Sequence, residues 1–301
     1  MKIKYIDAPA GSGKTRFLIS EIGEMVQWDR NILLCQPSKA LVDQTYGDMI
    51  ERCGADFPVT KIHEDTLSGQ NVASAIVGHF KNAGQGGQVV IITHSAFDLV
   101  PHFHKARFWD LFFDECPKVE QGFQIDVPQN HAYLTEHIIP SGDGFYVPVR
   151  AKSVSRLKAI VGSKDAVDGV FRDATKMMLT KGWKPLVQSE KYRGLLDGDS
   201  EATKLSICAV RTKSVISQFK SCTIASAMFR ETFFYKIFSR IGVEFIAYDE
   251  PQYPPLNGDE PAELAYMDHP NGHLIEIHYL DLPRWSKGIM MHYSEIVSRP
   301  H

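Results

Sequence analysis

Long apolar runs are missing from this 301-residue sequence. None approaches the roughly 18 consecutive apolar residues that a membrane-spanning helix needs, so we expect no membrane partner. Cysteine is also scarce, and Cys35, Cys53, Cys116, Cys208 and Cys222 follow no metal-ligand spacing. Their odd number and mostly apolar surroundings indicate reduced thiols. The chain opens on a strand-like segment that leaves no room for a signal peptide, and we therefore expect a cytoplasmic protein.

A strong excess of charge of either sign is absent as well, because the formal net charge is −3. Binding of nucleic acid would therefore need a local basic patch and could not use a field from the whole molecule. The chain has no internal repeat. Its composition, 44% hydrophobic and 23% charged, is that of an ordinary globular protein with one large domain or two.

A glycine-rich stretch, DAPAGSGKT, occupies Asp7–Thr15. The alternating residues of Lys2–Ile6 predict a strand before it, and the apolar spacing of Thr15–Val26 predicts a helix after it. Gly11 and Gly13 allow the backbone to turn its N–H groups inward without a Cβ clash. Together with the positive end of the helix dipole, these groups form a cradle for an anion.

The pattern is that of a phosphate-binding loop, with Ala8 where the first glycine usually stands. Lys14 can reach the outer phosphates of a nucleotide, and Thr15 can ligate Mg²⁺. The cofactors that we expect are ATP and Mg²⁺. A tight turn that binds nothing is the structural alternative. The residues predicted to hold the nucleotide are Ala10, Gly11, Ser12, Gly13, Lys14, Thr15 and Arg16.

An acidic pair follows a short apolar run in Phe108–Val119. Asp114 and Glu115 come directly after a predicted buried strand, and ligands of open α/β sheets bind outside the carboxyl ends of strands. We expect Asp114 to hold Mg²⁺ together with Thr15, and Glu115 to polarise the attacking water. The other interpretation is an exposed acidic pair in a loop.

With these two motifs in place, the chain resembles the first RecA-like motor domain of superfamily 2 helicases and translocases, of viral or phage type. Three further stretches carry the resemblance. Asn31–Met49 is similar to motif Ia, Val89–Val100 ends its apolar run in a threonine–histidine pair, and Cys222–Phe229 is similar to motif III. The resemblance covers roughly residues 1–120 and 215–250. The sequence departs from the family pattern at Pro117 and Met228.

The resemblance implies roles for five more residues. Ser38, Lys39, Thr93 and His94 would contact nucleic acid, and Ser226 would couple ATP hydrolysis to strand movement. Each has an ordinary alternative. Ser38 can cap a helix, the threonine–histidine pair can simply end a strand, and Ser226 can be a strand-end hydroxyl.

Strands ending near Ile6, Cys35, Ile92, Phe113 and Ala225 alternate with helical segments, which predicts an α/β fold with a mostly parallel central sheet. We expect a RecA-like domain over 1–250. An insertion over roughly residues 120–215 would separate the acidic motif from motif III. Basic residues of the insertion would either follow a nucleic-acid backbone or form a solvated face. Residues 251–301 are predicted to be a linker and the start of a following element, including a strand over 274–282.

The resemblance implies an ATP-binding and ATP-hydrolysing motor domain, the first of two RecA-like lobes. Its expected partners are nucleic acid, with DNA ahead of RNA, and a second RecA-like lobe in cis or in trans. Because that lobe supplies arginines to the nucleotide in the family, the isolated chain should hydrolyse ATP weakly and should not unwind a duplex. The alternatives are a packaging-motor-like P-loop ATPase, a nucleotide kinase, or an ATP-gated nucleic-acid clamp without unwinding activity.

Overall fold

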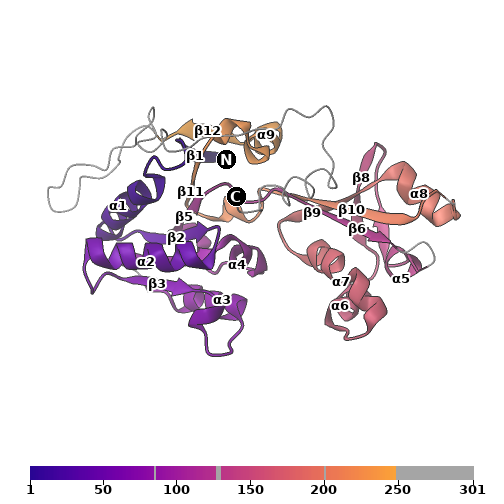
Figure 1. Cartoon of the computed structure of the whole chain (residues 1–301), viewed down its shortest axis with the longest axis horizontal. Coiled ribbons are helices and arrows are strands. Elements are labelled where there is room, and N and C mark those ends of the chain that lie inside the picture. Colours follow the sequence, from indigo (N-terminus) through magenta and orange to yellow (C-terminus); the bar gives the residue numbers. More distant parts are fainter. Residues whose placement is uncertain (85, 127–129, 200, 249–301) are drawn as a thin grey trace, which may run out of the picture. The chain divides into compact units, whose positions relative to one another are not determined.

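Seven strands form a parallel sheet in the computed structural model, which describes residues 1–84, 86–126, 130–199 and 201–248. All of them belong to one compact unit. The strand order is β12-β1-β11-β5-β2-β4-β3, and every pairing in the sheet is parallel (Figure 1). The strands are β1 (Lys2–Asp7), β2 (Asn31–Gln36), β3 (Val59–Ile62), β4 (Gln88–Thr93), β5 (Trp109–Asp114), β11 (Ser221–Ser226) and β12 (Glu244–Ala247).

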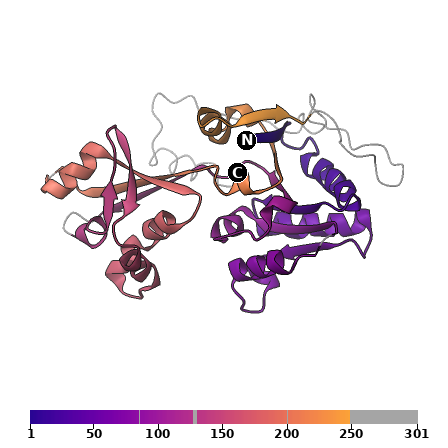
Figure 2. The same ribbon diagram turned by 180° about the vertical axis from the view of Figure 1, so that it is seen from behind.

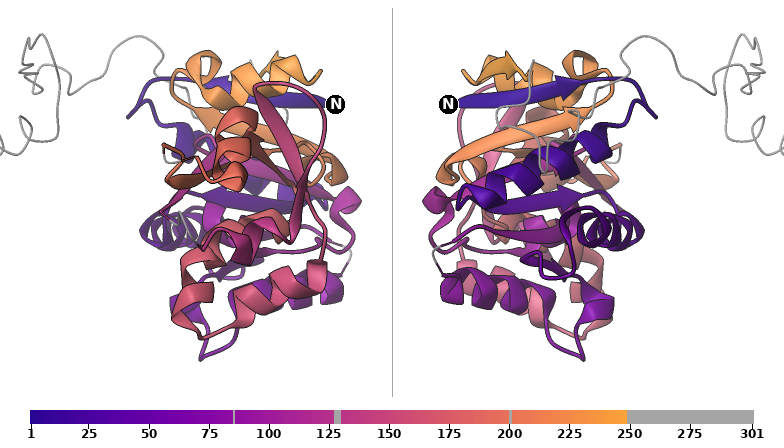
Figure 3. Two further views of the ribbon diagram at one scale, coloured as in Figure 1. Left: turned by 90° about the vertical axis from the view of Figure 1, so that its right-hand side faces the viewer. Right: turned by 90° about the vertical axis from the view of Figure 1, so that its left-hand side faces the viewer.

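Helices cover both faces of this sheet, as expected for parallel strands, which have to be buried on both sides. One apolar cluster joins α1 and α2 to one face, and another joins α3, α4 and α9 to the opposite face (Figure 3). These helices are α1 (Lys14–Gln27), α2 (Lys39–Cys53), α3 (Val72–Asn82), α4 (His94–Leu99) and α9 (Phe233–Arg240). The predicted α/β class with a parallel central sheet is confirmed.

The segment between β5 and β11 forms a second, antiparallel sheet of order β6-β10-β9-β8-β7. Figure 2 shows this sheet and its helices from behind. Its apolar residues form a separate core, and β10 alternates buried and less buried residues along its length. The elements are β6 (Glu120–Asp126), α5 (Ala132–Thr135), β7 (Ile138–Pro140), β8 (Tyr146–Ala151), α6 (Val154–Gly162), α7 (Ala166–Leu179), β9 (Trp183–Gln188), α8 (Ser189–Asp197) and β10 (Lys204–Arg211).

An insertion between the acidic motif and motif III is thus part of the fold. The domain boundaries at 250 and 251 stay a prediction, and the expected linker and the strand over 274–282 lie outside the described residues. Among the described residues, no helix combines the length and the apolar character that crossing a bilayer requires.

Because the strands of the first sheet are parallel, their carboxyl ends meet along one edge. The strands expected from the sequence end at Asp7, Gln36, Thr93, Asp114 and Ser226, each one residue beyond the expected position. β11 lies between β1 and β5. This order puts the last residue of β11 between the glycine-rich loop and the acidic pair.

Candidate nucleotide site at the carboxyl edge of the sheet

The loop between β1 and α1 depends on two glycines in the left-handed region. Gly11 has φ 78° and Gly13 has φ 89°, values that a residue with a Cβ adopts only with strain. Gly13 is also the N-cap of α1, and no side chain caps this helix end. The first amide groups of an uncapped helix have no intrahelical acceptor, so this end of α1 is suited to an anion.

The ammonium group of Lys14 is held inside this loop. Its Nζ donates to the carbonyl oxygens of Ala8 at 3.0 Å and Pro9 at 2.9 Å, and it lies 3.8 Å from Oε1 of Glu115. Only 6% of the residue is exposed. Ser12 is equally buried, and its hydroxyl oxygen has no hydrogen-bond partner among the described residues. The loop therefore offers a cation and an unpaired hydroxyl where a phosphate group would bind.

Thr15 and Asp114, 99 positions apart in the chain, meet at the base of the loop. Thr15 Oγ1 donates to Oδ2 of Asp114 at 2.8 Å, and Nε2 of Gln36 donates to the same oxygen at 3.2 Å. A hydroxyl and a carboxylate are both hard oxygen ligands, and Mg²⁺ is usually bound by one or two carboxylates together with phosphates and water. No cluster of three or more His, Cys, Asp or Glu able to hold a metal occurs in the described part of the chain. The pair of oxygen donors from Thr15 and Asp114 fits Mg²⁺ in chemical type.

Burial acts on the ionisation of Asp114. The carboxyl group is 2% exposed, and this desolvation raises its pKa above the usual value of 3.8. The hydrogen bonds from Thr15 and Gln36 oppose that shift, because they favour the charged form. A bound divalent cation would favour the carboxylate still further. The hydrogen bonds from Thr15 and Gln36 thus offset only part of the effect of burial, and a bound cation would offset more of it.

Glu115 adopts an unusual backbone conformation, with φ 70° in the left-handed region. Its amide donates to the carbonyl oxygen of Ala225 at 2.7 Å, and its Oε2 accepts a hydrogen bond from Ser226 Oγ at 2.8 Å. A non-glycine residue in this region costs energy and persists only where its surroundings enforce it. Here the main-chain turn directs one carboxylate oxygen to Ser226 and the other toward Lys14.

A cavity of about 860 Å³ opens over these residues. Its lining includes the acidic pair and the loop residues Ala10, Gly11, Gly13, Lys14, Thr15 and Arg16. The wall contributed by α2 contains four polar residues that sequence reasoning left without a site role, namely Gln44, Asp48, Glu51 and Arg52. The sequence-predicted nucleotide residues Lys14, Thr15, Asp114 and Glu115 are therefore brought together in one place.

Gln36 is a further residue of the site that the sequence interpretation missed. It is fully buried, and its Nε2 bridges Asp114 Oδ2 and Thr45 Oγ1, the latter at 2.7 Å. The available signal was its position, because it is the polar last residue of the apolar run NILLCQ. A polar side chain at the carboxyl end of a buried parallel strand lies at the edge where ligands bind.

Ser38 and Lys39 begin α2 beside the cleft. Ser38 Oγ accepts from the amide of Leu41 at 3.2 Å, so the serine caps the helix. Nζ of Lys39 lies 2.9 Å from a carboxylate oxygen of Asp65 and 3.6 Å from one of Glu64. A phosphate group would have to compete with these two carboxylates. The nucleic-acid roles of Ser38 and Lys39 stay predictions.

Thr93 and His94 begin α4. Thr93 Oγ1 caps this helix by accepting from the amide of Ala96 at 3.1 Å. Nε2 of His94 lies 3.2 Å from the carbonyl oxygen of Cys35. Burial lowers the pKa of His94 to about 4, so the ring is neutral near pH 7. The ring cannot supply a positive charge to a phosphate at that pH, and a nucleic-acid contact by this pair also stays a prediction.

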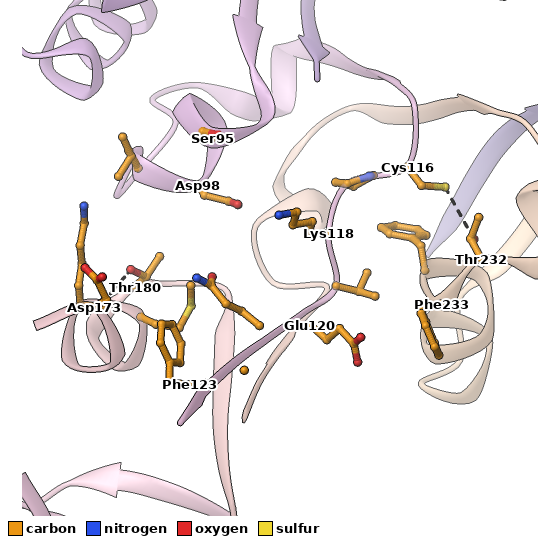
Figure 4. Close-up of a pocket in the computed structure, with 18 residues that line it drawn as sticks. Ser95, Asp98, Cys116, Lys118, Glu120, Phe123, Asp173, Thr180, Thr232 and Phe233 are labelled. Atoms are coloured by element: carbon orange, nitrogen blue, oxygen red, sulfur yellow. Dashed lines mark hydrogen bonds between the residues drawn. The ribbon is translucent and has the colours of Figure 1, made fainter. Parts of the chain in front are cut away.

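A second cavity of about 800 Å³ lies beyond the acidic pair (Figure 4). It is lined by residues from α4, the segment after Glu115, α7 and the start of α9. Cys116 Sγ donates to Oγ1 of Thr232 at 3.7 Å across one wall. Charges of both signs line it, among them Lys118, Glu120 and Asp173. The mixed charges indicate no particular class of ligand.

Comparison with known proteins adds little. No family model and no curated protein matches the sequence. Among solved structures the chain is similar to the C-terminal domain of the DEAD-box protein Dbp5, with 13% identity and a TM-score of 0.35. The alignment covers 83% of this chain and 92% of that one. The side chains of the cleft, and not this likeness, therefore carry the functional conclusion.

Proposed function

We propose that the chain binds ATP·Mg²⁺ in this cleft and hydrolyses it, as the first of two RecA-like lobes of a nucleic-acid helicase or translocase. The hydrogen bond between Thr15 and Asp114 carries the proposal. It joins a helix-starting hydroxyl and a strand-ending carboxylate beside a buried lysine and a constrained glutamate. This is the set of groups that hydrolysis of a nucleoside triphosphate requires.

Each side chain has a separate task. Lys14 would exchange its carbonyl acceptors for oxygens of the outer phosphates, and Thr15 and Asp114 would hold the metal. A magnesium ion held there would supply positive charge that offsets the negative charge developing on the phosphates. Glu115, oriented by Ser226, would accept a hydrogen bond from the attacking water and direct it at the terminal phosphate.

The nucleic-acid part of the proposal rests on Ser226 and on the order of motifs. Ser226 is the last residue of β11 and contacts the carboxylate of Glu115 directly. A small displacement of β11 would therefore move the group that activates water. This contact is a physical route by which binding elsewhere on the lobe could change the rate of hydrolysis, as a motor requires.

The test is phosphate release from ATP by the purified 301-residue chain, with and without single-stranded DNA or RNA. Glu115→Gln should still bind ATP·Mg²⁺ and should lower turnover by about 10² or more, because it removes the group that orients water. Lys14→Ala should lose nucleotide affinity. Glu190→Gln, which changes an exposed glutamate of α8, is the matched control and should behave as the parent.

Three results would contradict parts of the proposal. Unchanged turnover in Glu115→Gln would remove the hydrolytic role. Stimulation by small phosphoryl acceptors in place of polymers would indicate a kinase. A rate of ATP hydrolysis that neither DNA nor RNA changes would contradict the nucleic-acid part of the proposal and would support an ATPase that acts without nucleic acid.

A further inference from the structure

A third cavity, of about 600 Å³, lies at the opposite edge of the parallel sheet. Asn31 and Trp109, the first residues of β2 and β5, line it together with Lys220, which directly precedes β11. The nucleotide cleft uses the last residues of these strands, so the two cavities lie at opposite ends of them. We call the set Asn31, Lys105, Arg107, Phe108 and Lys220 the amino-edge site.

Positive charge is concentrated in the amino-edge site. Lys105, Arg107 and Lys220 are exposed, and the cavity lining contains a single carboxylate, that of Asp29. None of the three cations forms an ion pair with another of the residues that the structure describes. Unpaired cations on a chain of net charge −3 are a local anion site.

An exposed aromatic ring stands beside these cations. Phe108 is 52% exposed, and the guanidinium carbon of Arg107 lies 4.8 Å from its ring centroid. The next residue, Trp109, is 1% exposed and stacks on Phe80 with ring centroids 4.3 Å apart. The buried tryptophan fixes the chain directly after Phe108. The exposed ring is therefore presented on a rigid support.

The floor of the amino-edge site contains a polar group without a partner. Asn31 is 8% exposed, and its side-chain oxygen is buried and accepts no hydrogen bond within the described residues. A buried amide oxygen without a partner is costly, and a donor from a ligand or an ordered water at this cavity would satisfy it. It is a second observation, independent of the charges, that indicates a ligand.

We propose that the amino-edge site binds a single-stranded nucleic acid. Phosphates would contact Lys105, Arg107 and Lys220, and one base would stack on Phe108. Proteins that hold single strands combine a basic groove with exposed aromatic rings in this way. An acidic peptide would satisfy the cations but would bring no base to stack on the exposed ring of Phe108. The inference depends on the proposed function only in taking nucleic acid as the polymer, and it requires no ATP.

The experiment is fluorescence anisotropy of a labelled oligothymidylate with the full chain, without nucleotide, over a range of salt concentrations. Phe108→Ala should weaken binding about tenfold, because stacking of one base is lost. Lys105→Gln with Lys220→Gln should also weaken binding and should make the slope of log affinity against log salt shallower by about 1.4, or about 0.7 for each phosphate released.

The controls match the chemistry of each change. Phe145→Ala removes a ring that is 65% exposed in the loop before β8, and Lys204→Gln removes an exposed cation of β10. Both should bind as the parent does. Phe108 is at the surface, so its variant should keep the parent's circular dichroism and thermal midpoint.

The outcomes separate this proposal from the proposed function. Oligothymidylate binding that is lost in Phe108→Ala supports the amino-edge site even if the chain hydrolyses no ATP. Equal affinities for Phe108→Ala and Phe145→Ala would overturn it even if ATP hydrolysis responds to polymer. Binding of polyglutamate that depends on Lys105 and Lys220 but not on Phe108 would also overturn it, in favour of an acidic protein partner.

Discussion

At the scale of single residues, burial and hydrogen bonding act in opposite directions on the carboxylate of Asp114. Desolvation favours its protonated form, and the donors Thr15 and Gln36 favour its charged form. Glu115, the neighbouring acid, is instead half exposed and held by Ser226. Two adjacent carboxylates thus have different surroundings, which suits one of them to a metal and the other to water.

His94 gives a prediction for the pH dependence of stability. Its pKa is about 4 in the folded chain and near 6.5 when unfolded, so between these values the unfolded state binds more protons. The free energy of unfolding should therefore fall as the pH is lowered from 6.5 toward 4. Between pH 7 and pH 5 we expect His94 to lower the free energy of unfolding by about 2 kcal/mol, because each unit of pKa shift corresponds to about 1.36 kcal/mol.

The measurement is urea unfolding of the parent and of His94→Gln at both pH values. Glutamine does not titrate, so the variant should lose less stability on acidification, while all other groups contribute alike to both proteins. Identical losses in the two proteins would contradict the assignment of a buried neutral ring.

At the scale of elements, Arg211 joins the end of β10 to the parallel sheet. Its Nε donates to the carbonyl oxygen of Lys118 at 2.7 Å, its NH1 lies 2.7 Å from Asp98 of α4, and its guanidinium covers the ring of Trp183 at 4.6 Å. The residue is 5% exposed. Arg211 therefore links the end of β10 to α4 and to the segment after the acidic pair.

Arg211→Ala should lower the free energy of unfolding by about 3 kcal/mol, because removal of one partner of a buried pair leaves the other charge uncompensated. The free energy of unfolding of Arg211→Lys should lie between those of the alanine variant and the parent, since lysine keeps the charge but loses the planar set of guanidinium donors. Urea unfolding would measure both. Arg193→Ala, at an exposed position of α8, is the control, and an Arg211→Ala loss no larger than that of this control would refute the prediction.

At the scale of the whole molecule, the described residues form three apolar clusters. Two lie on the faces of the parallel sheet, and the third is confined to the antiparallel sheet and its helices. The third cluster contains no residue of the nucleotide cleft. Stabilisation by a nucleotide should therefore be unevenly distributed over the chain.

Hydrogen exchange measured by mass spectrometry would test this distribution. ATP·Mg²⁺ at a hundred times its dissociation constant should stabilise the unit that binds it by about 2.7 kcal/mol. We expect slower exchange in β1, β2, β5 and β11, and unchanged exchange in β8 and β9. Lys14→Ala should abolish the difference. Equal slowing in both sheets would show that the two cores unfold as one cooperative unit.

The sequence alone predicted five strands of the parallel sheet and the glycine-rich turn that joins the first strand to its helix. The ends of these five strands were predicted to within one residue, because apolar runs and glycine-rich turns act over a few neighbouring positions, whereas β3 and β12 were not predicted. The pairing of a helix-starting threonine with a strand-ending aspartate followed from the rule that parallel strands present their carboxyl ends at one edge.

Only the tertiary structure decided which polar groups face one another across that edge. The bridge from Gln36 to Asp114, the contact of Ser226 with Glu115 and the contact of Lys39 with Asp65 join residues 26 to 111 positions apart. The antiparallel pairing of the second sheet, the amino-edge site and the burial of His94 arise in the same way. Such contacts depend on strand order and on packing between distant segments, and no pattern within a short window of the chain contains that information.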